Sequence, residues 1–206
     1  MTSISIIGSG KMSGAIAEVA ARAGAGIQII KRSATSTSAA RPGLEYGVMG
    51  DELTGDLVVL AVPYGAYEGV LEHYRDQLGE KVVIDISNPI DFSTYDRLRS
   101  PADSSTAAEL AKLLPEGSAV VKAFNVNLGD TLVSGTNGTT RTTVLYAGDY
   151  ADAKMSVAAL IEAAGMRAVD VGPLTRAREL EAMGFLQIIM AALGRTRYES
   201  GFTLLE

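Results

Sequence analysis

Short apolar runs alternate with stretches of helical periodicity along most of the chain. The first apolar run covers residues 3–7, and apolar residues then recur at i, i+3, i+4, i+7 and i+8 between Met12 and Ala23, which is one face of a helix. Residues 57–62 form a continuous apolar run of the kind that is buried on both faces of a parallel sheet. The pattern predicts further strands at residues 27–30, 44–46, 81–86, 119–123, 142–147 and 167–171.

Helices are predicted between several of these strands. Apolar stripes with helical spacing cover residues 67–78, 105–114 and 157–164, and a final helix is expected over roughly residues 176–193. The second half of this last helix is apolar nearly all round, so we expect it to be buried, in part against a second copy of the chain. Residues 124–141 have the irregular composition of loops.

This alternation indicates an α/β fold, with a doubly wound, mostly parallel Rossmann sheet and a small C-terminal α/β extension. Six βα units fit before residue 124, which is the size of a dinucleotide-binding domain. We therefore expect the Rossmann domain over residues 1–123 and the extension over residues 124–206. The second substrate and the contact between two copies are expected on the side of the extension.

Composition removes several classes of function. The chain has 206 residues, a net charge of −6, a single His and no Cys. An acidic protein repels nucleic-acid phosphates, and the lack of Cys excludes disulfides, thiolate catalysis and Cys-ligated metal centres. We therefore expect no nucleic-acid partner and no metal. Because no apolar run has the length of a membrane span and the first residues lack the basic region of a secretory signal, we expect a cytoplasmic protein with no membrane partner.

A Gly-rich turn follows the first predicted strand and opens the first predicted helix. It matches the dinucleotide-binding pattern G-x-G-x-x-G, with Ser at the third glycine, and reads Gly8, Ser9, Gly10, Lys11, Met12, Ser13. In this pattern the first glycine makes the tight turn and the second admits the pyrophosphate, which the N-terminus of the helix then binds. The surrounding strand and helix favour dinucleotide binding over the alternative, a structural turn in a Rossmann-like fold without a cofactor.

Lys31, Arg32 and Ser33 end the second predicted strand, where enzymes that use NAD carry Asp or Glu for the ribose 2′-hydroxyl. A carboxylate would repel a 2′-phosphate, whereas Arg binds one and Lys and Ser add contacts. The sequence therefore favours NADP over NAD, and the alternative is that Lys31 and Arg32 are a solvated strand end. In the loop that follows, three polar residues either close over the adenosine or reflect ordinary loop composition: Ser36, Thr37 and Arg41.

Turns at the carboxyl ends of other strands should also face the cofactor, because ligands bind at that edge of a doubly wound sheet. We expect Asn88 to contact the nicotinamide ribose. The other residues expected to line the cofactor site on this ground are Ala61, Val62, Pro63, Ala123 and Asn125.

Candidate acid–base groups are few. A dehydrogenase that acts on an alcohol usually moves a proton with a His, Lys or Tyr. His73, the single His, lies in a predicted helix away from any strand end, so we do not expect it to be catalytic. Lys122, at the end of a strand, is the candidate catalytic residue, and orienting an anionic ligand or a structural role are its alternatives. So sparse a site fits hydride exchange between two organic carriers, which requires chiefly distance and orientation.

Several segments, in order along the chain, together carry a family resemblance. They are the turn from Gly8 to Ala15, Leu-Val-Val-Leu-Ala-Val-Pro63, Val-Ile-Asp-Ile-Ser-Asn-Pro89, Val-Val-Lys-Ala-Phe-Asn125, Ala-Gly-Asp149 and Asp-Val-Gly-Pro-Leu174, followed by Arg-Glu-Leu-Glu181. Taken together, these segments resemble the family of NADP oxidoreductases that depend on coenzyme F420. The resemblance implies hydride transfer between NADP(H) and this deazaflavin, with NADP and F420 as the two carriers and a homodimer as the usual assembly.

The same resemblance implies roles for individual residues. It associates Ser9, Lys11 and Met12 with the pyrophosphate turn, residues 31–33 with the 2′-phosphate, and residues 120–125 and the following loop with the deazaflavin. The last segment also resembles the cytoplasmic reductase domain of membrane ferric reductases, which pass hydride from NADPH to a flavin. A flavin is therefore the alternative second substrate.

Two further hypotheses stay open on the residues alone. An NADPH-dependent reductase of a small carbonyl or imine would be expected to add a large helical domain, whereas residues 125–206 mix predicted strands and helices. A module that senses NADP(H) without chemistry would have an empty second pocket, or a cleft blocked by residues 124–140.

Overall fold

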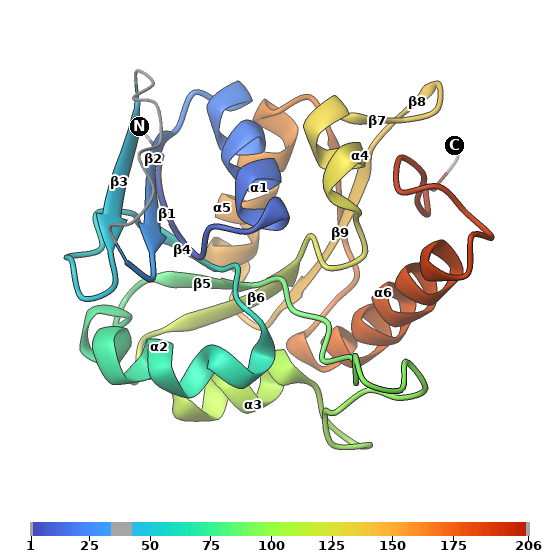
Figure 1. Cartoon of the computed structure of the whole chain (residues 1–206). Helices are drawn as coiled ribbons and strands as arrows, with labels where there is room; N and C mark the ends of the chain where they lie inside the picture. Colours follow the sequence, from blue (N-terminus) through green and yellow to red (C-terminus); the bar gives the residue numbers. More distant parts are fainter. Residues whose placement is uncertain (1, 34–42, 205–206) are drawn as a thin grey trace.

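An eight-stranded sheet runs through the centre of the computed structural model, which describes residues 2–33 and 43–204 (Figure 1). Its strands are β1 (Ser3–Ile7), β2 (Gly26–Lys31), β3 (Leu44–Val48), β4 (Leu57–Leu60), β5 (Val82–Asp85), β6 (Ala119–Ala123), β9 (Thr143–Gly148) and β10 (Arg167–Asp170). Their spatial order is β10-β9-β6-β5-β4-β1-β2-β3. The first six strands are parallel and follow the order of a Rossmann fold, which confirms the predicted fold class.

The last two strands belong to the same sheet. β9 pairs antiparallel with β6, and β10 pairs parallel with β9. The sheet therefore continues across residue 123, where the sequence suggests a domain boundary, and that boundary stays a prediction. Because β9 runs against β6, the segment that joins them begins and ends at the same edge of the sheet, which is the edge where β1, β4 and β5 also end.

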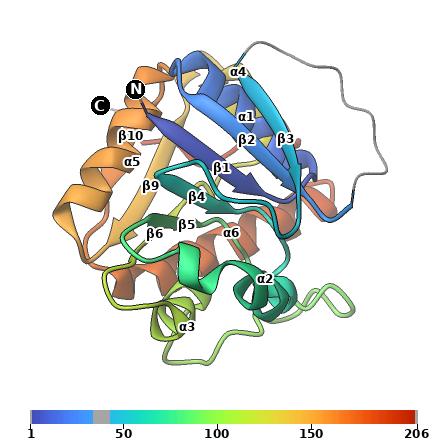
Figure 2. The same cartoon turned by 90° about the vertical axis from the view of Figure 1, so that its left-hand side faces the viewer.

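Helices cover both faces of the sheet (Figure 2). One face carries α1 (Lys11–Arg22), α4 (Gly129–Ser134) and α5 (Ala151–Ala163), and the other carries α2 (Tyr67–Tyr74) and α3 (Thr106–Leu113). α6 (Ala177–Ala192) contacts α3 and β9, away from β1–β3. The result is a three-layer arrangement in which the carboxyl ends of the parallel strands are left open to ligands.

Alternation along the central strands produces two separate apolar layers. In β4, Leu57 and Val59 pack with the helices of one face, whereas Val58 and Leu60 pack with those of the other. Successive side chains of a strand point to opposite faces, so a strand covered on both sides has to be apolar throughout. This explains why the sequence of β4 shows no alternation of polar and apolar residues.

Two predictions about the elements were wrong. Before residue 124, only three strands are followed by a described helix before the next strand, so six complete βα units are not formed in the described part of the chain. Residues 124–141 are not simply loop, since they contain α4 and a hairpin of β7 (Thr136–Asn137) and β8 (Thr140–Arg141). α4 and these strands are too short to produce a periodic pattern, and α4 is held by packing on α1 instead.

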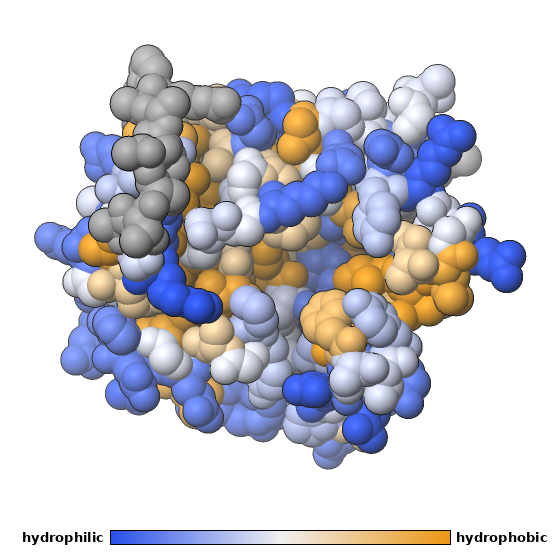
Figure 3. Space-filling view, in the orientation of Figure 1, coloured by the Kyte–Doolittle hydropathy of each residue, from blue (hydrophilic) through white to orange (hydrophobic). Residues whose placement is uncertain are grey.

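The final helix is buried along one stripe only. Leu180, Gly184, Gln187 and Ala191 face the interior, whereas Leu186 is 52% exposed. The space-filling view shows the hydrophobic surface that gathers over α6 (Figure 3). The expected burial of its whole second half is therefore not reached within a single copy. None of the helices in the described ranges 2–33 and 43–204 has the length and apolarity that crossing a bilayer requires.

Candidate functional site

The Gly-rich turn between β1 and α1 is shaped by two glycines with different constraints. Gly8 has a φ of 128°, and a Cβ built on it would collide with the carbonyl oxygen of Ala61 at the end of β4. Gly10 caps α1 without any side-chain hydrogen bond, and a Cβ built there would meet no protein atom within 4 Å. The first glycine is thus required by close packing, while the second faces open space at the start of a helix.

The start of α1 has the features of an anion site. No acidic residue lies in its first turn, and no side chain caps its N-terminus. Ser13, at the place of the third glycine, is buried, and its hydroxyl has no hydrogen-bond partner among the described residues. A small residue there lets the helix pack close to the strand, and the free helix N–H groups suit a phosphate.

Lys11 leaves this turn in the direction of α4. Its ammonium lies 2.8 Å from Asp130 Oδ1 and 5.9 Å from the ring centroid of Tyr198. Met12, the next residue, is partly buried against the core between the sheet and α1. The charged residue of the turn therefore connects the expected cofactor side to the segment after β6.

A cavity of about 700 Å³ extends from the Gly-rich turn to the face of α2. This volume is within the range of small-molecule sites. The described residues that line it are Gly8, Ser9, Gly10, Ile30, Arg32, Met49, Ala61, Val62, Pro63, Gly65, Ala66, Gly69, Val70 and His73. The structure thus brings the turn, the end of β2 and residues 61–63 together, and the open glycine and uncapped helix fit a dinucleotide.

The three residues at the end of β2 lie differently. Arg32 is exposed and lines the cavity, and Ser33 is also exposed. Lys31 is 8% exposed, and its ammonium lies 4.0 Å from the ring centroid of Tyr46 on β3. Arg32 is therefore the basic group of this set that reaches the cavity. Three other expected contacts, Ser36, Thr37 and Arg41, lie outside the described residues.

Two asparagines join the ends of β5 and β6. The amide of Asn88 donates to the Asn125 carbonyl oxygen at 2.7 Å, and the amide of Asn125 donates to Asn88 Oδ1 at 2.8 Å. Asn125 also donates to the Leu180 carbonyl oxygen of α6 at 2.8 Å. A Cβ built on Gly184 would collide with Asn88 Oδ1, so α6 can approach this pair only because residue 184 is a glycine. We call Asn88 and Asn125 the asparagine clasp.

Phe124 lies between β6 and Asn125 and has an unusual backbone conformation. It has a φ of 62°, an uncommon value for an aromatic residue, and it is completely buried beside Ala123. Such a backbone conformation persists only where the surroundings hold it. The packing of Phe124 thus sets where Asn125 emerges.

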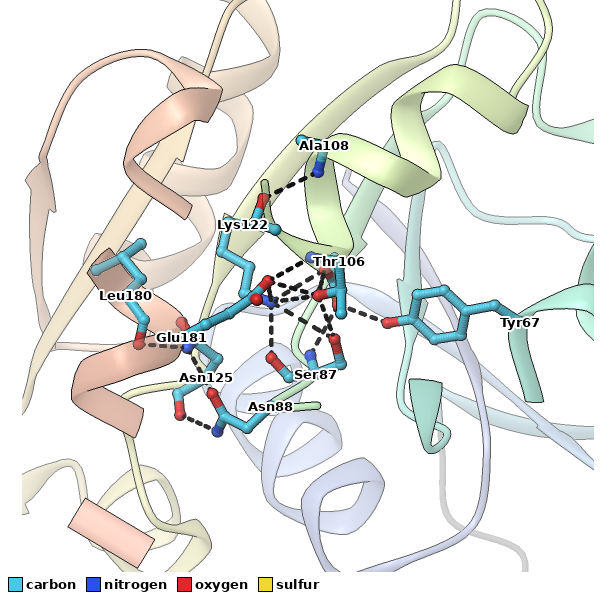
Figure 4. Close-up of polar contacts among 11 residues, drawn as sticks. Tyr67, Ser87, Asn88, Thr106, Ala108, Lys122, Asn125, Leu180 and Glu181 are labelled. Atoms are coloured by element: carbon cyan, nitrogen blue, oxygen red, sulfur yellow. Dashed lines mark hydrogen bonds and ion pairs between the residues drawn. The ribbon is translucent and has the colours of Figure 1, made fainter. Parts of the chain in front are cut away.

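Lys122 lies inside a network of buried polar groups (Figure 4). Its side chain has no exposed surface, and its ammonium lies 3.0 Å from Asp85 Oδ2 and 2.9 Å from Glu181 Oε1. It also donates to the carbonyl oxygen of Ser87 at 2.6 Å and to Thr106 Oγ1 at 3.1 Å. We call Tyr67, Asp85, Ser87, Thr106, Lys122 and Glu181 the strand-end network.

The network joins five elements, α2, β5, α3, β6 and α6, and the loop after β5. Glu181 on α6 accepts from the backbone N–H of Thr106 at 2.9 Å, which satisfies a donor at the start of α3. Tyr67 on α2 donates its hydroxyl to Asp85 Oδ1 at 2.5 Å, and the Ser87 N–H donates to the same oxygen at 2.8 Å. Ser87 directly precedes Asn88, so these bonds fix the strand end from which the clasp projects.

Electrostatics shift the pKa values of Asp85 and Tyr67 in this network. Burial raises the pKa of Asp85, but the Lys122 ammonium, the Tyr67 hydroxyl and the Ser87 N–H outweigh it, and the net pKa lies below the ordinary value. Burial and the charge of Asp85 raise the pKa of Tyr67 well above its usual range. The carboxylate is therefore the acceptor and the phenol the donor.

Sequence reasoning found Lys122 but missed its partners. The signal for Asp85 was present, because an acidic residue inside an apolar strand has to be paired when it is buried. Nothing in the sequence pairs Glu181 with Lys122, since 59 residues separate them. The structure also places His73, which the sequence put away from any strand end, in the lining of the cavity.

The sequence is similar to a family of oxidoreductases and to individual reductases. Residues 3–89 match the family model described as NADP oxidoreductase, coenzyme F420-dependent. The chain is 30% identical over 181 residues to metalloreductase STEAP3 of Rattus norvegicus. The aligned region covers 87% of this chain and 36% of that protein. It is 31% identical over 150 residues to an F420-dependent NADP reductase of Methanocaldococcus jannaschii, which covers 68% of this chain and 66% of the relative.

A solved structure gives the same fold over nearly the whole length. A protein of Arthrobacter sp. FB24, described as a candidate F420-dependent NADP reductase, superposes with a TM-score of 0.86 at 24% identity and covers 98% of this chain and 99% of that one. The chain thus spans about a third of one curated relative and just under two thirds of the other. Over residues 3–89, which hold the Gly-rich turn and the first five strands, this chain matches the coenzyme F420-dependent NADP oxidoreductase family.

Proposed function

We propose that the chain is an NADP-dependent oxidoreductase that transfers hydride between NADP(H) and coenzyme F420. The observation that carries the proposal is the cavity that opens from the Gly-rich turn and reaches Arg32, in a chain whose residues 3–89 match the F420-dependent family. The relative from Methanocaldococcus jannaschii, whose name states F420-dependent reduction of NADP, supports the same pair of carriers.

The cofactor-binding residues act mainly through backbone groups and one basic side chain. The N–H groups at the start of α1, opened by Gly10, hold the pyrophosphate, and Ser9 and Lys11 add to this turn. Arg32 binds the 2′-phosphate at the end of β2, where no described carboxylate lines the cavity. Residues 61–63 then flank the dinucleotide on its way to the clasp.

The chemistry requires little from acid–base side chains. NADPH gives a hydride to the oxidised deazaflavin, which takes a proton from solvent, so that NADP⁺ and the reduced deazaflavin leave. Lys122 is completely buried and does not reach a substrate, so we assign it to positioning the clasp through Ser87 rather than to proton transfer. The asparagine clasp then orients the nicotinamide against the second carrier.

The second carrier binds beside the segment after β6. This segment starts at the clasp and leads to α4, where Asp130 forms an ion pair with Lys11. We also propose a homodimer in the cytoplasm, in which a second copy covers the exposed apolar side of α6, including Leu186. If Leu186→Glu leaves the mass in solution equal to that of the parent chain, this dimer contact is wrong.

A flavin is the second candidate for the hydride acceptor. The observation in its favour is the similarity to a metalloreductase, which extends over 87% of this chain. The same Gly-rich turn and clasp would serve either acceptor, because both are planar rings that accept hydride beside the nicotinamide.

A stopped-flow assay of NADPH oxidation tests the function. NADPH would be mixed with enzyme and the oxidised deazaflavin, with FMN and FAD in parallel. Rapid loss of NADPH absorbance with the deazaflavin alone supports the proposal, turnover with flavins alone supports the second candidate, and no turnover with any acceptor overturns both.

Arg32 provides a sharper version of this assay. Arg32→Ala should raise the KM for NADPH about tenfold or more and leave the KM for NADH nearly unchanged, because only NADPH carries the 2′-phosphate. Arg178→Ala is the matched control, since Arg178 is exposed at the start of α6 and does not line the cavity. Equal effects of Arg32→Ala on the two cofactors would contradict the assignment.

A further inference from the structure

His73, on α2, lines the same cavity as the Gly-rich turn. Gly65, Gly69 and His73 are spaced by four residues, so they share one face of α2 and the turn before it. The two glycines add no side chain to that face, and His73 is the one of the three that does. Among the described lining residues, the polar side chains are those of Ser9, Arg32 and His73.

One hydrogen bond fixes the imidazole. His73 Nδ1 lies 2.9 Å from the carbonyl oxygen of Gly69. A carbonyl oxygen only accepts, so Nδ1 carries the proton of the neutral ring and Nε2 presents a lone pair. In this tautomer Nε2 is available as a hydrogen-bond acceptor.

The loop after β3, which lies next to His73, is also held in place. The hydroxyl of Tyr74 accepts from the N–H of Gly50 at 2.8 Å and thereby ties the loop after β3 to α2. Gly50 has a φ of 100°, and a Cβ built on it would lie 3.9 Å from His73 Cδ2. Met49 and Val70 line the cavity beside this point and offer apolar surface.

We infer that His73 reads the adenine base of the dinucleotide, with Nε2 accepting a hydrogen bond from the exocyclic amino group. The inference rests on the proposed binding of NADP(H). With the pyrophosphate at Gly10 and the 2′-phosphate at Arg32, the base takes up the remainder of the cavity, whose lining includes Met49, Val70 and His73. Met49 and Val70 face the ring, and His73 supplies the acceptor.

The arrangement makes His73 a determinant of base specificity. Adenine carries an amino donor at the position where hypoxanthine carries a carbonyl oxygen. An acceptor facing that oxygen loses its hydrogen bond and meets a second lone pair, so the hypoxanthine nucleotide should bind more weakly. Because His73 lies at the adenosine end, this role is separate from catalysis.

The test compares the affinity for NADPH with that for its hypoxanthine analogue, in which oxygen replaces the amino group. Dissociation constants would be measured by calorimetry for the parent chain, His73→Ala, His73→Gln and the matched control Glu72→Ala, an exposed neighbour outside the cavity lining. The parent chain should prefer NADPH about tenfold. His73→Ala should abolish the preference, His73→Gln should restore part of it through its amide oxygen, and Glu72→Ala should keep it.

Each outcome separates the inference from the function on which it rests. If the parent chain binds NADPH without preferring it to the analogue, or if His73→Ala keeps the full preference, the inference is wrong and NADP binding stands. If the parent chain binds neither nucleotide, the proposed function fails and the inference with it. Arg32→Ala should change the ratio of NADPH to NADH affinity and leave the preference for adenine intact, so the contacts to the 2′-phosphate and to the base are tested independently.

Discussion

The cavity wall consists mostly of glycines and apolar side chains, whereas the ends of β5 and β6 rest on buried charged side chains. Gly10 and Gly69 leave space in the cavity, and few polar groups line it. At the strand ends Lys122 is shared by Asp85 and Glu181 without any exposed surface. The first region is built to admit a ligand, and the second is built to hold its own strand ends still.

The difference shows how one sheet edge combines access with rigidity. An open cleft gains specificity from a few placed groups such as Arg32. A buried ion network adds little net stability but costs much when one partner is removed. Mutations in the cavity should therefore act mainly on ligand binding, whereas mutations in the strand-end network should act mainly on stability.

The largest effect is expected from Lys122→Met. This change leaves Asp85 and Glu181 buried without their cation and should lower the free energy of unfolding by about 3–5 kcal/mol. Urea unfolding measures it. The control is Lys112→Met, which removes an exposed ion pair with Glu109 and should give no measurable change. A Lys122 variant as stable as the parent would mean that the network does not behave as a buried charge cluster.

Gly8 and Gly10 sharpen the comparison within the open region. Gly8→Ala forces a strained φ and a collision with Ala61, so we expect a loss of about 2–4 kcal/mol of unfolding free energy. Gly10→Ala should leave stability within about 0.5 kcal/mol of the parent and weaken NADPH binding about tenfold or more. Thermal unfolding and calorimetric titration separate the two effects. Normal NADPH affinity in Gly10→Ala would show that the pyrophosphate does not approach this residue.

Gly184→Ala should disturb the contact between α6 and the asparagine clasp. The added methyl group collides with Asn88, which is expected to cost about 1–3 kcal/mol of stability. Because the clasp is displaced while the Gly-rich turn is not, kcat should fall more than the affinity for NADPH. Ala182→Gly on the exposed side of α6 is the control. Loss of NADPH affinity with an unchanged kcat would reverse the roles of the two regions.

The smallest effect is expected from Tyr67→Phe, which should lower the free energy of unfolding by about 1.5 kcal/mol. The pKa of Asp85 is lowered in the folded chain, so its stabilising contribution is complete above the ordinary aspartate pKa of about 3.9 and is lost as the pH falls below it. Removing the Tyr67 hydroxyl brings the folded pKa closer to the ordinary value. The variant should therefore lose less stability than the parent between neutral pH and about pH 3, and an equal loss would contradict the assignment.

Sequence alone predicted the open region better than the closed one. The Gly-rich turn, the apolar strand β4 and the position of Arg32 depend on local spacing, which a sequence displays directly. The strand-end network depends on contacts such as that between Lys122 and Glu181, and local periodicity carries no information on contacts 59 residues apart. The direction of Lys31 was also hidden, because it is decided by Tyr46 on the neighbouring strand.

Glu181 contacts elements that come much earlier in the chain, and this contact bears on the order of folding. The carboxylate of Glu181 reaches Thr106 and Lys122 across 75 and 59 residues, and such distant contacts form only after long loops have closed. Until α6 docks, Asp85 is the single described ion-pair partner of Lys122. The first N–H of α3 has no acceptor from Glu181 at that stage. The sheet that emerges first during synthesis is therefore completed by a helix that emerges much later.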